Sequence, residues 1–231
     1  MSRHSNASTY AGTMRASDPT PMAVRQAYDQ RAVEYAEHFA DVAAAHPDDR
    51  ARIRAWAHAR SGPVLDAGCG PGHWTEELRQ HRVDAEGIDH SPEFLAIAAS
   101  RFPDARFRQA SLEQTGCADT SLDGVLAWYS VIHTCPEELA AVLAEFRRVL
   151  RPGGSLLVGL FAWSHLEPFE HAVVRAYRWP PSQFSCVLHE AGFSVLSVIE
   201  RHEPGTRPQC IIEARRSPDV ASETGSGISR K

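Results

Sequence analysis

A glycine-rich segment is the feature of this 231-residue chain that points most directly to chemistry. Residues 64–72 read Val-Leu-Asp-Ala-Gly-Cys-Gly-Pro-Gly, so a short apolar run leads into three closely spaced glycines. Where a strand turns into a helix, glycines let the backbone approach a bound molecule closely. The dinucleotide fingerprint GxGxxG is incomplete, because His73 stands where its third glycine would be, and no GK[ST] of a P-loop follows. The segment therefore predicts a ligand site other than a nicotinamide, flavin or P-loop site.

A second candidate is the aspartate that ends the next apolar run, Gly87-Ile88-Asp89. A carboxylate about 20 residues beyond a glycine-rich turn commonly accepts hydrogen bonds from the hydroxyls of a ribose. The alternative is a solvated carboxylate at a strand end. Because the glycine-rich segment lies at the expected distance before it, we favour ribose binding by Asp89.

The candidate for proton transfer is His133, which follows the apolar segment 122–129. An imidazole titrates near neutral pH and is suited to this task. The same side chain could instead pack against a bound cofactor or cap a loop. No metal is expected, because the 12 histidines form no HxH or HxxxH pair and the five cysteines form no CxxC pair.

These residues must be positioned by the elements around them, and strand-like and helix-like segments alternate along the chain. Apolar spacing predicts a helix from Met22 to Ala45 and a second one through Ile53 and Trp56. The segments that follow are strand 64–65, helix 73–81, strand 83–89, helix 92–100, strand 105–110, strand 122–129, helix 136–149, strand 155–161, helix 180–191 and strands 193–201 and 208–215.

This alternation predicts an α/β fold with a mostly parallel sheet covered by helices on both faces. The last two strands have no helix between them. We therefore expect an antiparallel hairpin with Pro204-Gly205 in its turn, and an irregular stretch from about 162 to 179.

Composition and charge exclude several classes of protein. The net charge is −5 at pH 7, so a broadly basic nucleic-acid-binding face is not expected. No run approaches the roughly 18 apolar residues that would span a bilayer. The odd number of cysteines and the absence of a secretory segment near Met1 favour a reducing, cytoplasmic location. Polar composition predicts a disordered arm at 1–21 and tail at 217–231 around one domain at 22–216.

Four segments, in this order, resemble the motifs of class I S-adenosylmethionine (SAM)-dependent methyltransferases of the type 11/25 group that act on small molecules. They are VLDAGCGPG, GIDHSPEFL, LDGVLAWYSVIHT and RVLRPGGSLLVGLF. The resemblance runs from about residue 23 to 215. It implies a Rossmann-like, seven-stranded, mostly parallel sheet with an antiparallel last strand, SAM as cofactor, and methyl transfer to a small molecule.

The resemblance also assigns roles to residues at the glycine-rich turn. Asp66 and Gly68 match positions that place the amino group of the methionine moiety. Gly70 and Gly72 match positions where the backbone passes under the cofactor.

Further along the chain, Asp89 matches the acid that binds the ribose. His90 stands where an aliphatic side chain usually packs on adenine, and a flat imidazole could stack there equally well. Ser111 replaces the acid that would contact the adenine amino group, which leaves the backbone of Leu112 for that contact.

Ala127 and Trp128 follow the fourth strand, where the family lines the methionine moiety. Tyr28, Arg31 and Tyr35 belong to the N-terminal helix that closes over SAM in this group. For Tyr35, packing in the core is an equally good interpretation.

The methyl acceptor is expected to meet the aromatic stretch after the fifth strand, where rings and histidines alternate in a pattern suited to a small planar molecule. This set is Phe161, Trp163, His165, Phe169, His171, Tyr177 and Trp179. The alternative is a lid that packs on its own core. Arg175 and Arg178 could steer an anionic acceptor or be solvated. Beyond methyl transfer, a non-catalytic SAM-binding subunit of a biosynthetic complex stays open, and neither nucleic-acid nor membrane partners are expected.

Overall fold

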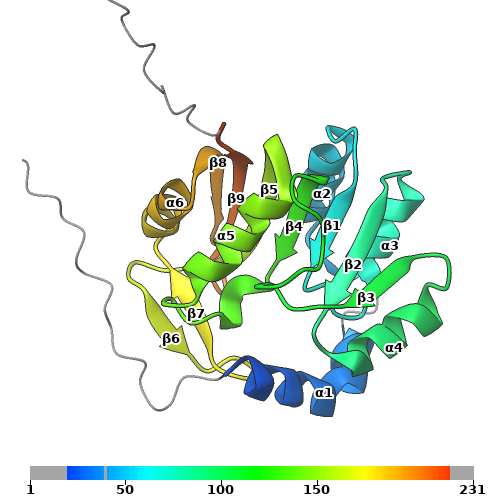
Figure 1. Ribbon diagram of the computed structural model, residues 1–231. Helices are drawn as coiled ribbons and strands as arrows, with labels where there is room; N and C mark the ends of the chain where they lie inside the picture. The colour runs from blue at the N-terminus through cyan, green and yellow to red at the C-terminus, as the bar shows by residue number, and fades with distance from the viewer. Residues whose placement is uncertain (1–19, 39–40, 219–231) are drawn as a thin grey trace, which may run out of the picture.

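The computed structural model describes residues 20–38 and 41–218. A mixed sheet runs through them, with strand order β3-β2-β1-β4-β5-β7-β6, and β9 pairs with both β5 and β8 (Figure 1). The strands are β1 (Val64–Ala67), β2 (Ala85–Asp89), β3 (Arg106–Gln109), β4 (Leu122–Trp128), β5 (Leu150–Ala162), β6 (Glu167–Phe169), β7 (Ala176–Trp179), β8 (Phe193–Arg201) and β9 (Gln209–Arg216). The helices are α1 (Pro21–His38), η1 (Val42–Ala44), α2 (Pro47–His58), α3 (His73–Gln80), α4 (Pro92–Arg101), η2 (Val131–His133), α5 (Leu139–Val149) and α6 (Pro181–Glu190).

Side chains of the central strands alternate between two apolar clusters, as the two-residue period of a strand requires. On β4, Val125 and Ala127 pack with α5 and α6, whereas Leu126 packs with α2 and α3. On β5, Val158 packs in the cluster with α5 and α6, and Leu157 packs in the cluster with α2 and α3. Both faces of the sheet are therefore covered by helices, and the predicted α/β class is confirmed.

The sheet has nine strands where the resemblance implied seven. Seven of them keep the implied arrangement, because β9 runs antiparallel to both β5 and β8, and its register on β5 covers Ser155 to Phe161. The other two, β6 and β7, form a hairpin inside the stretch expected to be irregular. β7 pairs with β5 only at Phe161 and Ala162, so the hairpin extends the sheet at the carboxyl end of β5.

The N-terminal helical region differs from the single helix expected over 22–45. α1 ends at His38, and a short 3₁₀ turn follows from Val42. Asp41 has extended backbone angles, and its side chain accepts a hydrogen bond from the Ala43 amide, so it begins a new element. The short polar side chain of aspartate favours such caps over a helix interior.

The carboxyl ends of the parallel strands meet at one edge of the sheet. Asp66 is in register with Gly87 on β2 and with Leu126 on β4. α1 lies across this edge, between α4 and the β6–β7 hairpin (Figure 1). Most of the predicted arm and tail lies outside the described residues, and no helix within 20–38 or 41–218 is long and apolar enough to cross a membrane.

Candidate active site

A cavity of about 670 Å³ opens at the carboxyl edge of the sheet, beneath α1. Its walls come from the glycine-rich turn, the start of α3, the ends of β4 and β5, residues 171–173 and the β8–β9 turn. A narrower cavity of about 90 Å³ adjoins it, lined by Asp89, His90 and Leu112 among others. The two cavities adjoin, because they share six lining residues: Tyr28, Tyr35, Gly68, Gly70, Trp128 and Tyr129.

The glycine-rich turn is held against β2 and presents its backbone to both cavities. The amides of Gly68 and Cys69 donate to the Ile88 carbonyl at 2.8 and 2.9 Å. Gly70 has a positive φ of 53°, and a Cβ placed on it would meet nothing within 4 Å. Because Gly70 has no side chain, a ligand has room to lie directly against its backbone.

Asp89 joins the end of β2 to this turn. Its Oδ2 accepts from the Gly70 amide at 2.9 Å, and its Oδ1 accepts from the Ser91 amide at 2.8 Å. Burial raises the pKa of this carboxyl, opposed by neighbouring His90 and by the backbone hydrogen bonds. The Nε2 atom of His90 is buried beside it without a hydrogen-bond partner, in the lining of the narrow cavity. A carboxylate and an unpartnered ring nitrogen therefore face the same small space.

Asp66, at the end of β1, is 1% exposed and lines the larger cavity. Its Oδ2 accepts from the Thr75 hydroxyl at 2.7 Å. Burial raises the pKa of the Asp66 carboxyl to about 7, because a low-dielectric surrounding disfavours the charged form. A cationic amino group placed nearby would favour its ionised form.

His133 is held at both ring nitrogens. Its Nδ1 lies 2.9 Å from the Arg175 carbonyl oxygen, which can only accept, so Nδ1 carries the proton. Its Nε2 then accepts from the Tyr28 hydroxyl at 2.7 Å. Burial lowers the pKa of His133 to about 4. The imidazole is therefore neutral near pH 7, with both nitrogens engaged.

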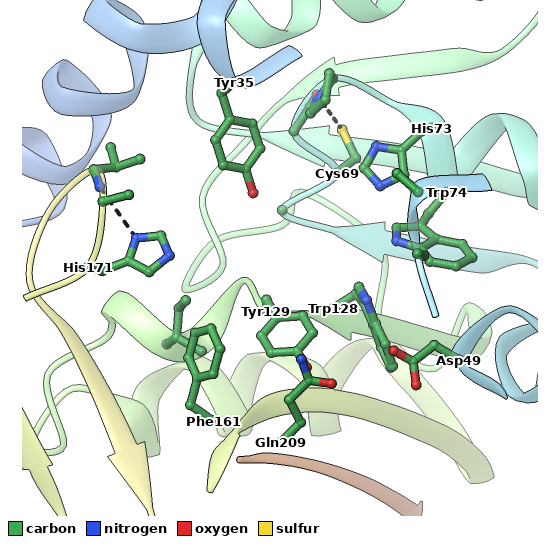
Figure 2. A pocket seen from close by; sticks show the side chains of 18 of the residues that line it. Tyr35, Asp49, Cys69, His73, Trp74, Trp128, Tyr129, Phe161, His171 and Gln209 are labelled. Atoms are coloured by element: carbon green, nitrogen blue, oxygen red, sulfur yellow. Dashed lines mark hydrogen bonds between the residues drawn. The ribbon is translucent and has the colours of Figure 1, made fainter. Parts of the chain in front are cut away.

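Ring contacts continue around the larger cavity, as Figure 2 shows for part of the set. Trp74 meets Trp128 at 6.0 Å between ring centroids, Trp128 meets Tyr129 at 5.4 Å, and Tyr129 meets Phe161 at 5.0 Å. Tyr35 enters from α1 with its hydroxyl directed toward the centre of the cavity (Figure 2). Part of the wall is thus aromatic, which suits a planar ligand.

A polar cluster closes one side of the cavity. Arg201 pairs with both carboxylate oxygens of Asp49, at 2.5 and 2.7 Å, and donates to the side-chain oxygen of Gln209. Asp49 is 4% exposed, so this bidentate pair ties α2 firmly to the end of β8.

Residues 64–154 match the methyltransferase domain family. Over these residues the chain is similar to methyltransferase domains. The malonyl-[acyl-carrier protein] O-methyltransferase of Pectobacterium atrosepticum is 30% identical over 151 residues, which cover 65% of this chain and 57% of that protein. The chain thus spans less than two thirds of this curated relative.

Solved structures share the fold of this chain. The Burkholderia thailandensis 1,6-didemethyltoxoflavin-N1-methyltransferase, crystallised with 1,6-didemethyltoxoflavin and S-adenosylhomocysteine, has a TM-score of 0.70 at 20% identity, covering 88% of this chain and 93% of that one. The [4+2]-cyclase SpnF has a TM-score of 0.67 at 19% identity, with 87% and 99% covered. Because these names differ in reaction, the fold by itself does not fix the chemistry.

Ten of the thirteen residues selected from the sequence line this site. They are Tyr28, Arg31, Asp66, Gly68, Gly70, Asp89, His90, Leu112, Trp128 and His133. The other three lie outside both cavities. Gly72 packs against Phe107 and Ala98, the Ser111 hydroxyl accepts from the Gln114 amide, and Ala127 is buried in the sheet core.

The aromatic stretch divides between cavity and core. Phe161 and His171 line the larger cavity. Tyr177 and Trp179 are buried in the core. Arg178 pairs with Glu167 and stacks on Trp163, away from the lining.

Sequence reasoning missed Asp49, Arg201, Gln209 and Tyr129, all of which line the cavity. Arg201 lies 152 residues from its partner Asp49, so no local pattern relates them. Tyr129 carries one available signal, since it directly follows Trp128 at the end of a buried strand.

Proposed function

We propose that this protein transfers a methyl group from SAM to an N or O atom of a small-molecule acceptor, in specialised (natural-product) metabolism. The observation that carries the proposal is that the two cavities adjoin at Gly68 and Gly70. A nucleoside in the narrow cavity would place the rest of the cofactor beside the larger cavity and its aromatic wall.

The residues present fit the cofactor. Asp89, His90 and Leu112 line the narrow cavity, where Asp89 would bind the ribose and the other two would contact the adenine. The backbone at Gly68 and Gly70 would lie under the nucleoside, and Asp66 would face the amino group of the methionine moiety. The unpartnered His90 Nε2 and the open Cβ direction at Gly70 are the two features that such a ligand would use.

A narrow cavity of about 90 Å³ is below the usual range for ligand sites, which starts near roughly 300 Å³. Cofactor entry therefore requires lining side chains to move, and α1 contributes three of them, Val24, Tyr28 and Tyr35. Their return would exclude water and retain the bound molecule.

SAM supplies a methyl group already activated on a sulfonium, so the protein mainly has to orient the acceptor. The acceptor atom forms a bond to the methyl carbon as the carbon–sulfur bond breaks, and that electron pair stays on sulfur in S-adenosylhomocysteine. Reaction requires the two atoms to be held in line at roughly 3–3.5 Å. The aromatic walls around Tyr129 and Phe161 restrict a flat acceptor to few orientations.

For His133 we propose a positioning role rather than the base role considered from the sequence. Its Nε2 is engaged by Tyr28, and burial holds its pKa near 4, which makes it a weak base. Its two hydrogen bonds instead connect α1 to the backbone at Arg175.

A cytoplasmic location belongs to the same proposal. All five cysteines are free thiols in the structure, as expected in a reducing compartment.

Calorimetry with S-adenosylhomocysteine tests cofactor binding, with NADH as the negative control. Incubation with methyl-labelled SAM and metabolite extracts, followed by mass spectrometry, tests turnover. We expect nucleotide binding and a product one methyl group heavier. Binding without turnover in any extract would favour a non-catalytic SAM-binding subunit, and binding of NADH alone would reject the family-based proposal.

A further inference from the structure

Three arginines line the larger cavity, and they differ in their partners. Arg31 pairs with Glu34, and Arg201 pairs with Asp49. Arg207, in the β8–β9 turn, forms no ion pair with any carboxylate in the part of the chain that the structure describes. Its guanidinium instead lies over the rings of Phe169 and Phe161, 5.2 and 6.0 Å from their centroids.

The remaining carboxylates of the lining are already engaged. Glu203 lies 3.0 Å from the His46 ring nitrogen and 4.0 Å from Arg201. Asp41 accepts from the Ala43 amide, and Asp66 accepts from the Thr75 hydroxyl. Among the charged side chains that line this cavity, Arg207 is therefore the one with ring contacts but no ion pair or hydrogen bond to the described residues.

The wall next to Arg207 is built from rings. Phe161 contacts Tyr129, with centroids 5.0 Å apart, and His171, at 6.1 Å. The His171 Nδ1 faces the Val173 amide, as the dashed line in Figure 2 shows, so the neutral ring carries its proton on Nε2. Burial, together with the nearby charges of Arg207 and Arg31, lowers the pKa of His171 and keeps it neutral.

Tyr129 adds an unused polar group to this wall. Its hydroxyl is buried and has no hydrogen-bond partner. Its backbone has a positive φ of 55°, which is strained for an aromatic residue and is typical of functional sites. A ligand group that bonds to this hydroxyl would remove the cost of leaving it unsatisfied.

We infer that the methyl acceptor is a planar aromatic or heteroaromatic molecule that carries an anionic group, with its ring against Phe161 and Tyr129 and its anion paired with Arg207. A guanidinium suits this task, because it binds carboxylates in a bidentate manner and also stacks on rings. The inference rests on the proposed function, since it assigns the larger cavity to the acceptor. It also replaces Arg175 and Arg178 with Arg207 as the residue that selects an anion.

The test uses the full chain saturated with S-adenosylhomocysteine and two matched pairs of probes. These are 2-naphthoate with 2-naphthamide, and quinoline-2-carboxylate with quinoline-2-carboxamide. Titration calorimetry gives the dissociation constants for the wild type, Arg207→Gln and Arg215→Gln. Arg215 is an exposed arginine at the far end of β9 and outside the cavity lining, so its substitution is a control of equal charge change.

We expect the acids to bind the wild type about tenfold more tightly than the amides, the size of a modest charge-assisted hydrogen bond. Arg207→Gln should reduce this preference to about onefold, and Arg215→Gln should keep it. Melting temperatures equal to that of the wild type would show that both variants fold.

Two results would overturn the inference and leave the proposed function standing. In the first, the wild type binds S-adenosylhomocysteine but binds the acids no more tightly than the amides, or does not bind the acids at all. In the second, the preference for acids over amides survives in Arg207→Gln. Failure to bind S-adenosylhomocysteine would instead reject the proposed function and the inference together.

Discussion

The Tyr28 hydroxyl donates a hydrogen bond to the Nε2 of His133, 105 residues further along the chain, at 2.7 Å. The direction of this bond is set by the other side of the ring, where Nδ1 donates to the Arg175 carbonyl. Both side chains line the narrow cavity. The pair therefore ties α1 to the segment after β4, at the place where the nucleoside is proposed to bind.

Loss of either partner should loosen α1 over the cofactor. We expect Tyr28→Phe and His133→Asn each to weaken S-adenosylhomocysteine binding about five- to tenfold, the value of one hydrogen bond of about 1–1.5 kcal/mol. The double variant should be no weaker than either single one, because both remove the same bond. Titration calorimetry gives the dissociation constants of the wild type, the two single variants and the double variant. The control is His165→Asn, because His165 lies outside the cavity lining. Additive losses would show that the two side chains act independently.

The same variant separates the two roles considered for His133. As a positioning residue, His133→Asn should raise KM for SAM and change kcat little. As a general base it would lower kcat by about 10²–10⁴-fold and alter the acidic limb of the pH–rate profile. Both constants, measured from pH 5 to 9 with any acceptor that turns over, decide between these outcomes.

Gly70 and Gly72 provide a matched pair of substitutions, because both have positive φ but face different surroundings. A Cβ on Gly72 would lie 2.6 Å from the Phe107 ring, whereas one on Gly70 would enter open space. Gly72→Ala should therefore lower the melting temperature more than Gly70→Ala.

Gly70→Ala should chiefly weaken S-adenosylhomocysteine binding, because the added methyl group occupies the space next to the backbone where the ligand is proposed to lie. Each change also carries the cost of a left-handed alanine, about 1–2 kcal/mol. Thermal melts and calorimetry on both variants test the contrast. Unchanged binding by Gly70→Ala would mean that the ligand does not approach this backbone.

The parts of the fold that follow local patterns were predictable. The strand, glycine turn and helix at 64–80 depend on neighbouring residues, and Asp89 lies at a fixed distance beyond them. The β6–β7 hairpin was missed, because β6 has three residues including Pro168 and β7 has four. Such short strands form through pairing with each other and with the end of β5, which a local pattern does not contain.

The site shows the same limit. Residues of the cofactor motifs could be selected because their spacing is fixed by one strand–turn–helix unit. Arg207 could not, since its importance comes from a contact with Phe161, which lies on a distant strand. The neighbouring stretch offered Arg175 and Arg178, whose sequence context is equally aromatic but which lie outside the lining.

Asp89→Asn should weaken S-adenosylhomocysteine binding about ten- to a hundredfold, because a charge-assisted hydrogen bond contributes roughly 1.5–3 kcal/mol. The Gly70 amide would also lose an ionised acceptor. Asp84→Asn is the control, since Asp84 lies just before the same strand and is exposed beside Arg106. Calorimetry should show no change for the control, and an unchanged constant for Asp89→Asn would exclude the proposed ribose contact.

Asp66 should make the free protein less stable as the pH rises. Its carboxyl has a pKa of about 7 in the folded chain against 3.8 in the unfolded one. The stabilisation linked to the bound proton is complete below 3.8 and is lost as the pH rises through about 7. Each unit of pKa difference corresponds to about 1.4 kcal/mol, so the loss in the free energy of unfolding is at most about 4 kcal/mol.

Asp66→Asn removes this titration and keeps an oxygen to accept from Thr75. The free energy of unfolding of the variant should therefore increase relative to that of the wild type as the pH rises from 4 to 8. Urea denaturation at several pH values gives the difference, with the exposed Asp119→Asn as control. S-adenosylhomocysteine should reduce the effect at pH 8, because its amino group would face the ionised carboxylate. A difference between wild type and Asp66→Asn that does not vary with pH would show that Asp66 is already ionised in the free protein.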